Sequence, residues 1–186
     1  MYYIVLGCLG FLTIHLFDIV ALKKSSLLKP VTWASGCAVL VYSIVRLFLG
    51  EQRFAVPFSV SLTGWILLIF SAAMLAWSLF INLPFRKTYV SPGIGDRLVT
   101  TGLYALVRHP GVHWFSLAMV ALALIAGSVQ MLIAVPVFIG LDVVLVFVQD
   151  RWVFPRMFRD YPQYRQVTPM LIPNRHSLKA FINSLT

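Results

Sequence analysis

Residues 112–148 have the sequence VHWFSLAMVALALIAGSVQMLIAVPVFIGLDVVLVFV, an almost uninterrupted apolar run. The run is too long for a single membrane-spanning helix, which needs about 20 residues. Small and polar residues, Gly127, Ser128 and Gln130, lie near its middle and are typical of a turn. We therefore predict two short transmembrane helices joined as a hairpin.

The rest of the 186-residue chain has the same character, with 60% hydrophobic residues, 11% charged residues and a mean hydropathy of +0.87. Soluble domains do not reach such values, so an integral membrane protein is predicted. Three apolar runs, 1–22, 31–50 and 58–83, precede the hairpin. The expected fold is all-α, with about five transmembrane helices, a polar loop and an amphipathic C-terminal tail.

The charged residues predict an orientation. The chain has 15 Lys and Arg against 6 Asp and Glu, a net charge of +9. In a soluble protein this excess would suggest nucleic-acid binding. Here all the cations except Arg46 and Arg53 fall in the first loop, the third loop and the tail, which share one side of a five-span protein. Positive-inside bias therefore puts the N-terminus outside and the C-terminus in the cytoplasm, across a bacterial inner membrane or the endoplasmic reticulum, and no nucleic-acid partner is expected.

The composition also divides the chain into two parts. Residues 1–84 hold the three N-terminal spans, and residues 85–186 hold a polar loop, the hairpin and a C-terminal cap. The loop, 85–110, is too polar to face lipid at mid-membrane. We expect the loop and the tail to meet on the cytoplasmic side and to form a site there.

Ionisable residues within spans are costly in lipid and usually face protein or water. His15 and Asp18 share one face of the first span, where a structural polar clamp is the favoured interpretation over a proton relay or a substrate contact. Asp142 precedes Gln149 by about two helical turns, so both side chains point the same way and Asp142 is expected to line a pocket. A transporter would also use such groups, but five spans without a repeat offer little pathway.

Arg108, His109 and Pro110 stand where the polar loop enters the fourth span, and proline there predicts a helix start that favours a bound anion. From the residues alone, Arg108 and His109 fit an interfacial cluster that holds lipid phosphate better than they fit a catalytic role. His109 and His113 are four residues apart, but no acidic residue of the H-E-x-x-H kind lies between them, so no metal site is predicted.

The tail mixes aromatic residues, among them Phe154, Phe158, Tyr161 and Tyr164, with arginines. This composition suits an anchor that lies on the lipid headgroups. It equally suits a lid that closes over a ligand bound by the polar loop. The two interpretations stay open at this point.

The order Leu98-Val99-Thr100-Thr101-Gly102-Leu103-Tyr104, then Arg108-His109-Pro110, then a hairpin and an acidic position resembles the isoprenylcysteine carboxyl methyltransferase family and its relatives that methylate phospholipids. The resemblance implies a methyltransferase that binds S-adenosyl-L-methionine from the cytoplasmic side. The cofactor-binding residues that it implies are Leu98, Val99, Gly102, Tyr104, Arg108, His109, Pro110, Gln149 and Asp150. Asp150 stands in the place of a family glutamate. Replacement of Asp150 or His109 by alanine is expected to abolish cofactor binding while leaving folding largely intact.

The chain departs from the family pattern at several positions. The family has tyrosine and glycine where this chain has Val112 and Trp114, and a glutamate pair where it has Gln149-Asp150. In the prenylcysteine enzymes an arginine meets the substrate at the position of Val146, so prenylcysteine is a poor candidate acceptor.

Methyl transfer from a sulfonium depends mainly on alignment and water exclusion. An amine or thiol acceptor would also have to lose a proton, and His109, His113 and Asp142 are the catalytic candidates by position. The predicted function is S-adenosylmethionine-dependent methylation of a lipophilic or small acceptor at the cytoplasmic membrane face, with membrane lipids as partners. The alternative is a non-catalytic membrane protein of the same fold that binds lipid or cofactor without turnover.

Overall fold

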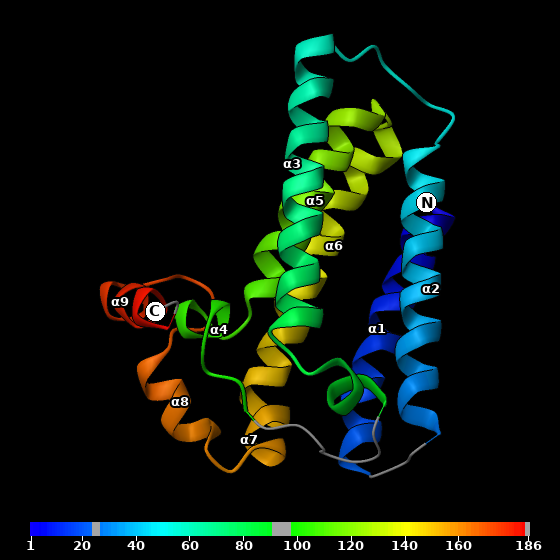
Figure 1. The fold of residues 1–186 in the computed structure, drawn as a ribbon. Helices are drawn as coiled ribbons and strands as arrows, with labels where there is room; N and C mark the ends of the chain where they lie inside the picture. Colours follow the sequence, from blue (N-terminus) through cyan, green and yellow to red (C-terminus); the bar gives the residue numbers. More distant parts are fainter. Residues whose placement is uncertain (24–26, 91–97, 185–186) are drawn as a thin grey trace.

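The computed structural model describes residues 1–23, 27–90 and 98–184, and these residues form helices without a β-strand (Figure 1). Four helices are long and apolar enough to cross a membrane, and one shorter apolar helix, α5 (Pro110–Ala126), accompanies them. The four are α1 (Tyr2–Leu22), α2 (Leu28–Phe48), α3 (Phe58–Ala76), which the π-helical turn η1 (Trp77–Ile81) extends, and α6 (Val129–Val148). The predicted all-α, multi-pass membrane fold is confirmed.

The predicted hairpin is formed by α5 and α6. Gly127 ends α5 in the left-handed region at φ 56°, where a Cβ would collide with the carbonyl oxygen of Phe54. Ser128 caps α6 by accepting a hydrogen bond from the Met131 amide at 3.3 Å, and its hydroxyl donates to the Leu47 carbonyl at 2.8 Å. The Phe54 amide donates to the Gly127 carbonyl at 2.8 Å, so the turn is bonded both to the end of α2 and to the loop that follows it.

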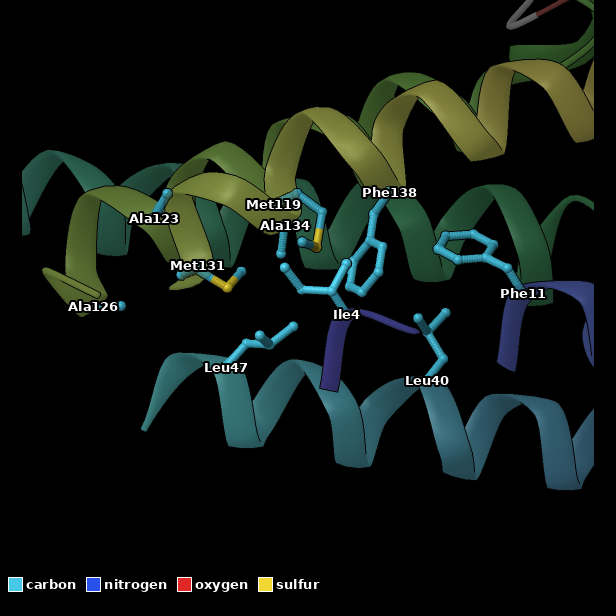
Figure 2. Packing of buried hydrophobic residues seen from close by; sticks show 10 residues of the cluster. All are labelled: Ile4, Phe11, Leu40, Leu47, Met119, Ala123, Ala126, Met131, Ala134 and Phe138. Carbon is cyan, nitrogen blue, oxygen red and sulfur yellow. The ribbon is translucent and has the colours of Figure 1, made fainter. Parts of the chain in front are cut away.

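Two closely packed helix pairs form the bundle, α1 with α2 and α3 with α5, and α6 contacts both pairs. Small residues allow the first pair to approach: a Cβ on Gly36 would lie 2.6 Å from the Ile14 amide nitrogen. Figure 2 shows the core that joins the pairs, with Phe138 of α6 fully buried beside Phe11 of α1 and Met119 of α5. This core closes the bundle at the end away from the polar segments.

Beyond Val148, where the apolar run and α6 end, the chain stays helical to Met157. The π-helical turn η3 (Gln149–Val153) and α7 (Phe154–Met157) continue α6 before the backbone becomes extended at Phe158. Polar side chains do not by themselves end a helix when they have partners, and both Gln149 and Asp150 are hydrogen-bonded. The tail then folds as α8 (Tyr161–Val167) and α9 (Arg175–Asn183).

The remaining short elements gather at the same end of the bundle. The π-helical turn η2 (Arg86–Val90) contacts α2, and α4 (Leu103–Leu106) contacts α5 and α9. Figure 1 shows α4, α7, α8 and α9 together at this end. The polar loop and the tail therefore meet, as predicted.

Candidate cofactor and acceptor site

A cavity of about 730 Å³ lies where the helical bundle meets the polar loop and the tail. This volume is within the range of about 300–1,000 Å³ that is usual for small-molecule sites. Eight of the residues predicted from the sequence line it: Leu98, Val99, Tyr104, Arg108, His109, Pro110, Asp142 and Gln149. The motif residues and the intramembrane acid thus share one space.

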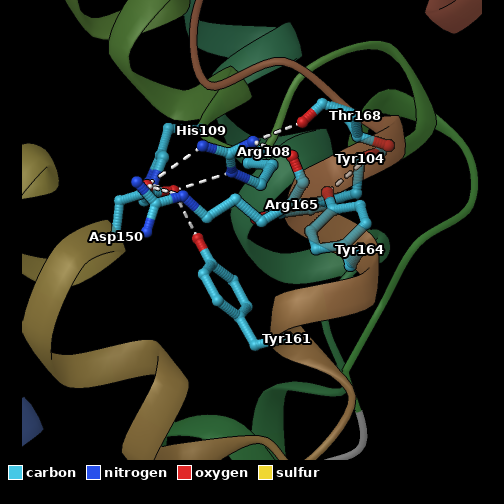
Figure 3. Close-up of polar contacts among 8 residues, drawn as sticks. All are labelled: Tyr104, Arg108, His109, Asp150, Tyr161, Tyr164, Arg165 and Thr168. Atoms are coloured by element: carbon cyan, nitrogen blue, oxygen red, sulfur yellow. Dashed lines mark hydrogen bonds and ion pairs between the residues drawn. The ribbon is translucent and has the colours of Figure 1, made fainter.

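Beside this cavity lies a buried ionic cluster centred on Asp150, which is 2% exposed (Figure 3). Arg108 donates two hydrogen bonds to its carboxylate, from Nε at 2.7 Å and from Nη2 at 3.0 Å. The Tyr161 hydroxyl donates a third at 2.5 Å, and Arg165 Nε lies 3.6 Å from Oδ2. A two-pronged contact of this kind fixes both partners in orientation as well as distance.

Arg108 also binds the tail through its backbone and side chain. Its Nη1 donates to the carbonyl oxygens of Arg165, at 3.2 Å, and Thr168, and its amide donates to the Pro169 carbonyl at 2.9 Å. Burial alone would lower the pKa of Arg108, but the hydrogen bonds and charge of Asp150 outweigh it and raise the pKa, so the guanidinium stays charged. The cluster therefore joins the start of α5, the end of α6 and α8.

His109 stands between the cluster and the cavity as the N-cap of α5. Its ring stacks on Phe154 with a centroid distance of 5.5 Å and an interplanar angle of 12°. Its Nε2 is buried, lies 3.5 Å from Asp150 Oδ1 and makes no hydrogen bond of good geometry. Burial lowers the pKa of His109 below its usual value, which keeps the imidazole neutral near pH 7.

Two tyrosines complete this wall of the cavity. Tyr164 donates a hydrogen bond to the Tyr104 carbonyl at 2.5 Å, and the Tyr104 hydroxyl donates to the Ser78 carbonyl at 3.2 Å. Burial raises the pKa of both phenols above the usual range, so both remain protonated donors. Together with Tyr161 and the aromatic rings of α7, they support the lid interpretation of the tail, because Phe154, Phe158, Tyr161 and Tyr164 all line the cavity.

Comparison with known proteins identifies the family. Residues 60–157, more than half of the chain, match the model of the phospholipid methyltransferases. The chain belongs to the phospholipid methyltransferase family. It is a membrane methyltransferase whose methyl donor is S-adenosylmethionine, which confirms the coarser part of the resemblance; the isoprenylcysteine enzymes themselves are not the family that matches. No curated protein and no solved structure matches the chain.

The residues around the cavity fit the cofactor of this methyltransferase. S-Adenosylmethionine carries hydrogen-bonding amino and hydroxyl groups, an aromatic base and a cationic centre. The cavity is lined by His109, by Gln149 with its side-chain amide, and by several aromatic rings. Aromatic faces suit both stacking with a base and contact with a cation.

Three residues that the resemblance and the spacing implicated lie elsewhere. Asp150 lies behind the cavity wall, bound by Arg108 and Tyr161. Gly102 does not line the cavity; it starts α4 at φ 60°, and its amide donates to Ser184 Oγ at 3.1 Å. His113 is exposed and also lies outside the lining. Its helical spacing from His109 is lost because His109 has φ −126° and ψ 67°, outside the helical region.

The position of Asp150 revises the expectation that its replacement would leave folding intact. Removing one partner of a buried ion pair leaves an uncompensated charge, so Asp150→Ala is now expected to destabilise the fold.

No group of three potential metal-ligating residues occurs in the part of the chain that the structure describes.

The departures from the family pattern affect the cavity unequally. Val112 and Val146 line it and make its wall apolar where the resemblance leads one to expect a phenol and a guanidinium. Trp114 is absent from the lining and packs edge-to-face on Phe70 of α3, with 5.7 Å between the ring centroids. The tryptophan in place of glycine therefore fills a helix interface and leaves the site open.

The N-terminal helices supply a large part of the wall, which sequence reasoning largely missed. Aromatic residues of α1, α2 and η2, namely Phe17, Trp33 and Tyr89, line the cavity and pack on one another. Gln149 donates to Asp18 Oδ2 at 2.6 Å, and so joins α1 to the end of α6. In the sequence, only the presence of His15 and Asp18 within the first span indicated that these helices contribute to the site, because they carry no recognisable motif.

Proposed function

We propose that this methyltransferase methylates the headgroup of a membrane phospholipid, with the headgroup at the polar end of the cavity and an acyl chain in its apolar end. The observation that carries the proposal is the change of lining within one cavity. Away from the ionic cluster the cavity is lined by the apolar residues Phe11, Ile14, Leu40, Ile44, Met119 and Leu122. An apolar channel inside the hydrocarbon layer suits a lipid tail.

A second, smaller cavity supports entry of the acceptor from the side. It measures about 270 Å³ and is lined by residues of α2, α3 and α5 that are all apolar: Ile44, Val45, Phe48, Leu49, Trp65 and Leu122. It shares Ile44 and Leu122 with the main cavity. A lipid tail lying between α2 and α3 could therefore remain in the bilayer while its headgroup reaches the site.

The polar end would hold the cofactor through Leu98, Val99, Tyr104, His109, Pro110 and Gln149, which line it. When bound, S-adenosylmethionine supplies an electrophilic methyl group on a sulfonium sulfur. Arg108 and Asp150 serve this site by position: their pair holds His109 and α8 against the cavity. Gly102 serves it through the backbone turn that delivers Tyr104 to the wall.

His109 and Asp142 are the proposed groups that accept a proton from the acceptor. His109 is neutral near pH 7 and faces the cavity. Within the described part of the chain, no hydrogen bond or ion pair involves the Asp142 carboxylate, so it can receive a proton or pair with a cation in an apolar setting. His113, whose side chain is exposed and outside the cavity lining, is left out of this proposal and serves as the control.

The distribution of cations supports an orientation with this end of the bundle in the cytoplasm. Arg86, Arg108, Arg151, Arg156 and Arg165 all lie on the elements at the site end, whereas Arg53 lies beside the Gly127 turn at the other end. By the positive-inside rule, this distribution supports a cytoplasmic location for the cofactor end.

The test is methyl transfer by the purified protein in lipid nanodiscs, using methyl-labelled S-adenosylmethionine and extraction of the lipid. Label in a phospholipid that disappears with His109→Ala, and persists with His113→Ala as the matched control, would support the proposal. Binding of S-adenosylhomocysteine without label in any lipid would favour the non-catalytic alternative. Label only in water-soluble acceptors would exclude a lipid substrate.

A further inference from the structure

Helix α9 takes no part in the cavity wall, and its role is unassigned by the proposed function. It packs on α4 and lies beside it at the site end of the bundle (Figure 1). A capping box fixes its start, since Asn174 Oδ1 accepts from the Ser177 amide at 2.8 Å and Ser177 Oγ accepts from the Asn174 amide at 3.0 Å. Its faces are therefore well defined.

The exposed face of α9 carries two adjacent stripes. Leu178 and Ile182, four residues apart, are 49% and 53% exposed. Arg175 and Lys179, also four residues apart, are exposed beside them. Residues at this spacing lie one above the other on a helix. An apolar stripe next to a cationic stripe is the pattern of helices that lie in the plane of a membrane surface.

The contacts of α9 place its C-terminal end at the level where a span ends. Ser184 accepts a hydrogen bond from the Gly102 amide at 3.1 Å. Gly102 in turn packs on Asn82, whose Nδ2 lies 2.7 Å from the position of a Cβ on this glycine. Asn82 directly follows the candidate span Phe58–Ile81. The exposed Trp77 in the last turns of that span is typical of a membrane–water interface.

The charge around α9 selects the kind of lipid. Residues 161–184 include three Lys and Arg residues, Arg165, Arg175 and Lys179, and contain no Asp or Glu. Cations next to an inserted apolar stripe attract anionic headgroups. A zwitterionic surface has no net charge and would attract these cations less strongly.

We propose that α9 is an in-plane helix that binds anionic phospholipids of the adjacent leaflet. Leu178 and Ile182 insert between the acyl chains, and Arg175 and Lys179 contact lipid phosphates. This proposal depends on the membrane-spanning fold alone and is independent of the methyl acceptor.

The experiment uses a nitroxide spin label on the full-length protein in nanodiscs. Cys8 and Cys37 are the free cysteines of the described chain and are replaced by alanine. The label is then attached at Leu178→Cys, with Gln163→Cys on the exposed surface of α8 as the matched control. Accessibility to oxygen and to a water-soluble nickel chelate is compared in phosphatidylcholine and in phosphatidylcholine mixed with phosphatidylglycerol.

We expect the oxygen-to-nickel accessibility ratio at position 178 to be several-fold higher than at position 163 and to rise further with phosphatidylglycerol. Arg175→Glu combined with Lys179→Glu should remove the further rise, whereas Arg159→Glu, an exposed charge reversal outside α9, should preserve it. Equal accessibility at both positions would overturn the proposal. So would an unchanged ratio on adding phosphatidylglycerol, or spin–spin broadening that showed a second copy of the chain covering α9.

Discussion

The two walls of the cavity are built on different physical principles. The wall formed by the polar loop, η3 and α8 is a network in which Arg108, Asp150 and Tyr161 satisfy one another in a buried setting. The wall formed by α1 and α2 is mainly aliphatic and aromatic, and it includes residues of 1–59, outside the family match. Hydrogen-bond networks demand one geometry, whereas apolar surfaces accept many shapes of similar volume. The first wall therefore suits the proposed cofactor end, and the second suits the proposed lipid acceptor.

Replacement of Asp150 should break the first wall most severely. Asp150→Ala leaves the buried Arg108 guanidinium without its carboxylate, and we expect a loss of about 3–5 kcal/mol of stability together with cofactor binding. Thermal unfolding in detergent, with and without S-adenosylhomocysteine, measures both effects. Asp160→Ala, at an exposed position, is the control. An Asp150→Ala variant that stays stable and still binds S-adenosylhomocysteine would show that the Arg108–Asp150–Tyr161 network is not required.

Replacement of His109 should separate chemistry from stability. His109→Ala removes a neutral group that faces the cavity, and we expect methyl transfer to fall by about 10²–10⁴-fold while His113→Ala has little effect. The pH profile gives a second readout. Because burial lowers the pKa of His109, the neutral form persists below the usual histidine pKa of about 6.5, and activity should decline only as the pH falls further. A decline that begins above this value would contradict the assignment.

A larger side chain in the second wall should weaken binding of the acceptor without affecting the cofactor. Ile44→Trp places a large side chain where the two cavities meet, and we expect the KM for lipid to rise by about tenfold, equivalent to ~1.4 kcal/mol, without a change in S-adenosylhomocysteine affinity. Ala38→Trp, on an exposed part of α2, is the matched control. An equal loss of cofactor affinity would show that the two walls are not separable.

The smallest expected effect concerns the contact between α9 and α4. Ser184→Ala removes the acceptor of the hydrogen bond from the Gly102 amide. We expect the free energy of unfolding to fall by about 1 kcal/mol or less, because this hydrogen bond is only partly buried. Thermal unfolding measures it, with Ser35→Ala as the control because Ser35 is exposed and bonds only within its own helix. A larger loss of stability would show that the contact between α9 and α4 belongs to the polar network of the first wall.

Much of the fold followed from hydropathy and turn residues. The hairpin was predicted from Gly127 and Ser128, and the start of α5 from Pro110, because proline and left-handed glycine act through local backbone geometry. The apolar run was predicted to end at Val148, where α6 ends, but the π-helical continuation was not predicted, because it depends on partners of Gln149 and Asp150 that are distant in sequence. The division of the chain at residue 84 remains a prediction.

The sequence by itself determined that this protein is a multi-pass helical membrane protein, and its motifs pointed to a methyltransferase. Apolar length and local motifs encode these properties, because each is decided within a few helical turns. The tertiary structure alone decided what each motif residue contacts. It placed Asp150 against Arg108, 42 positions away in sequence, moved His113 out of the site and brought α1 and α2 into the wall. Such contacts depend on how helices pack, and no local pattern specifies that packing.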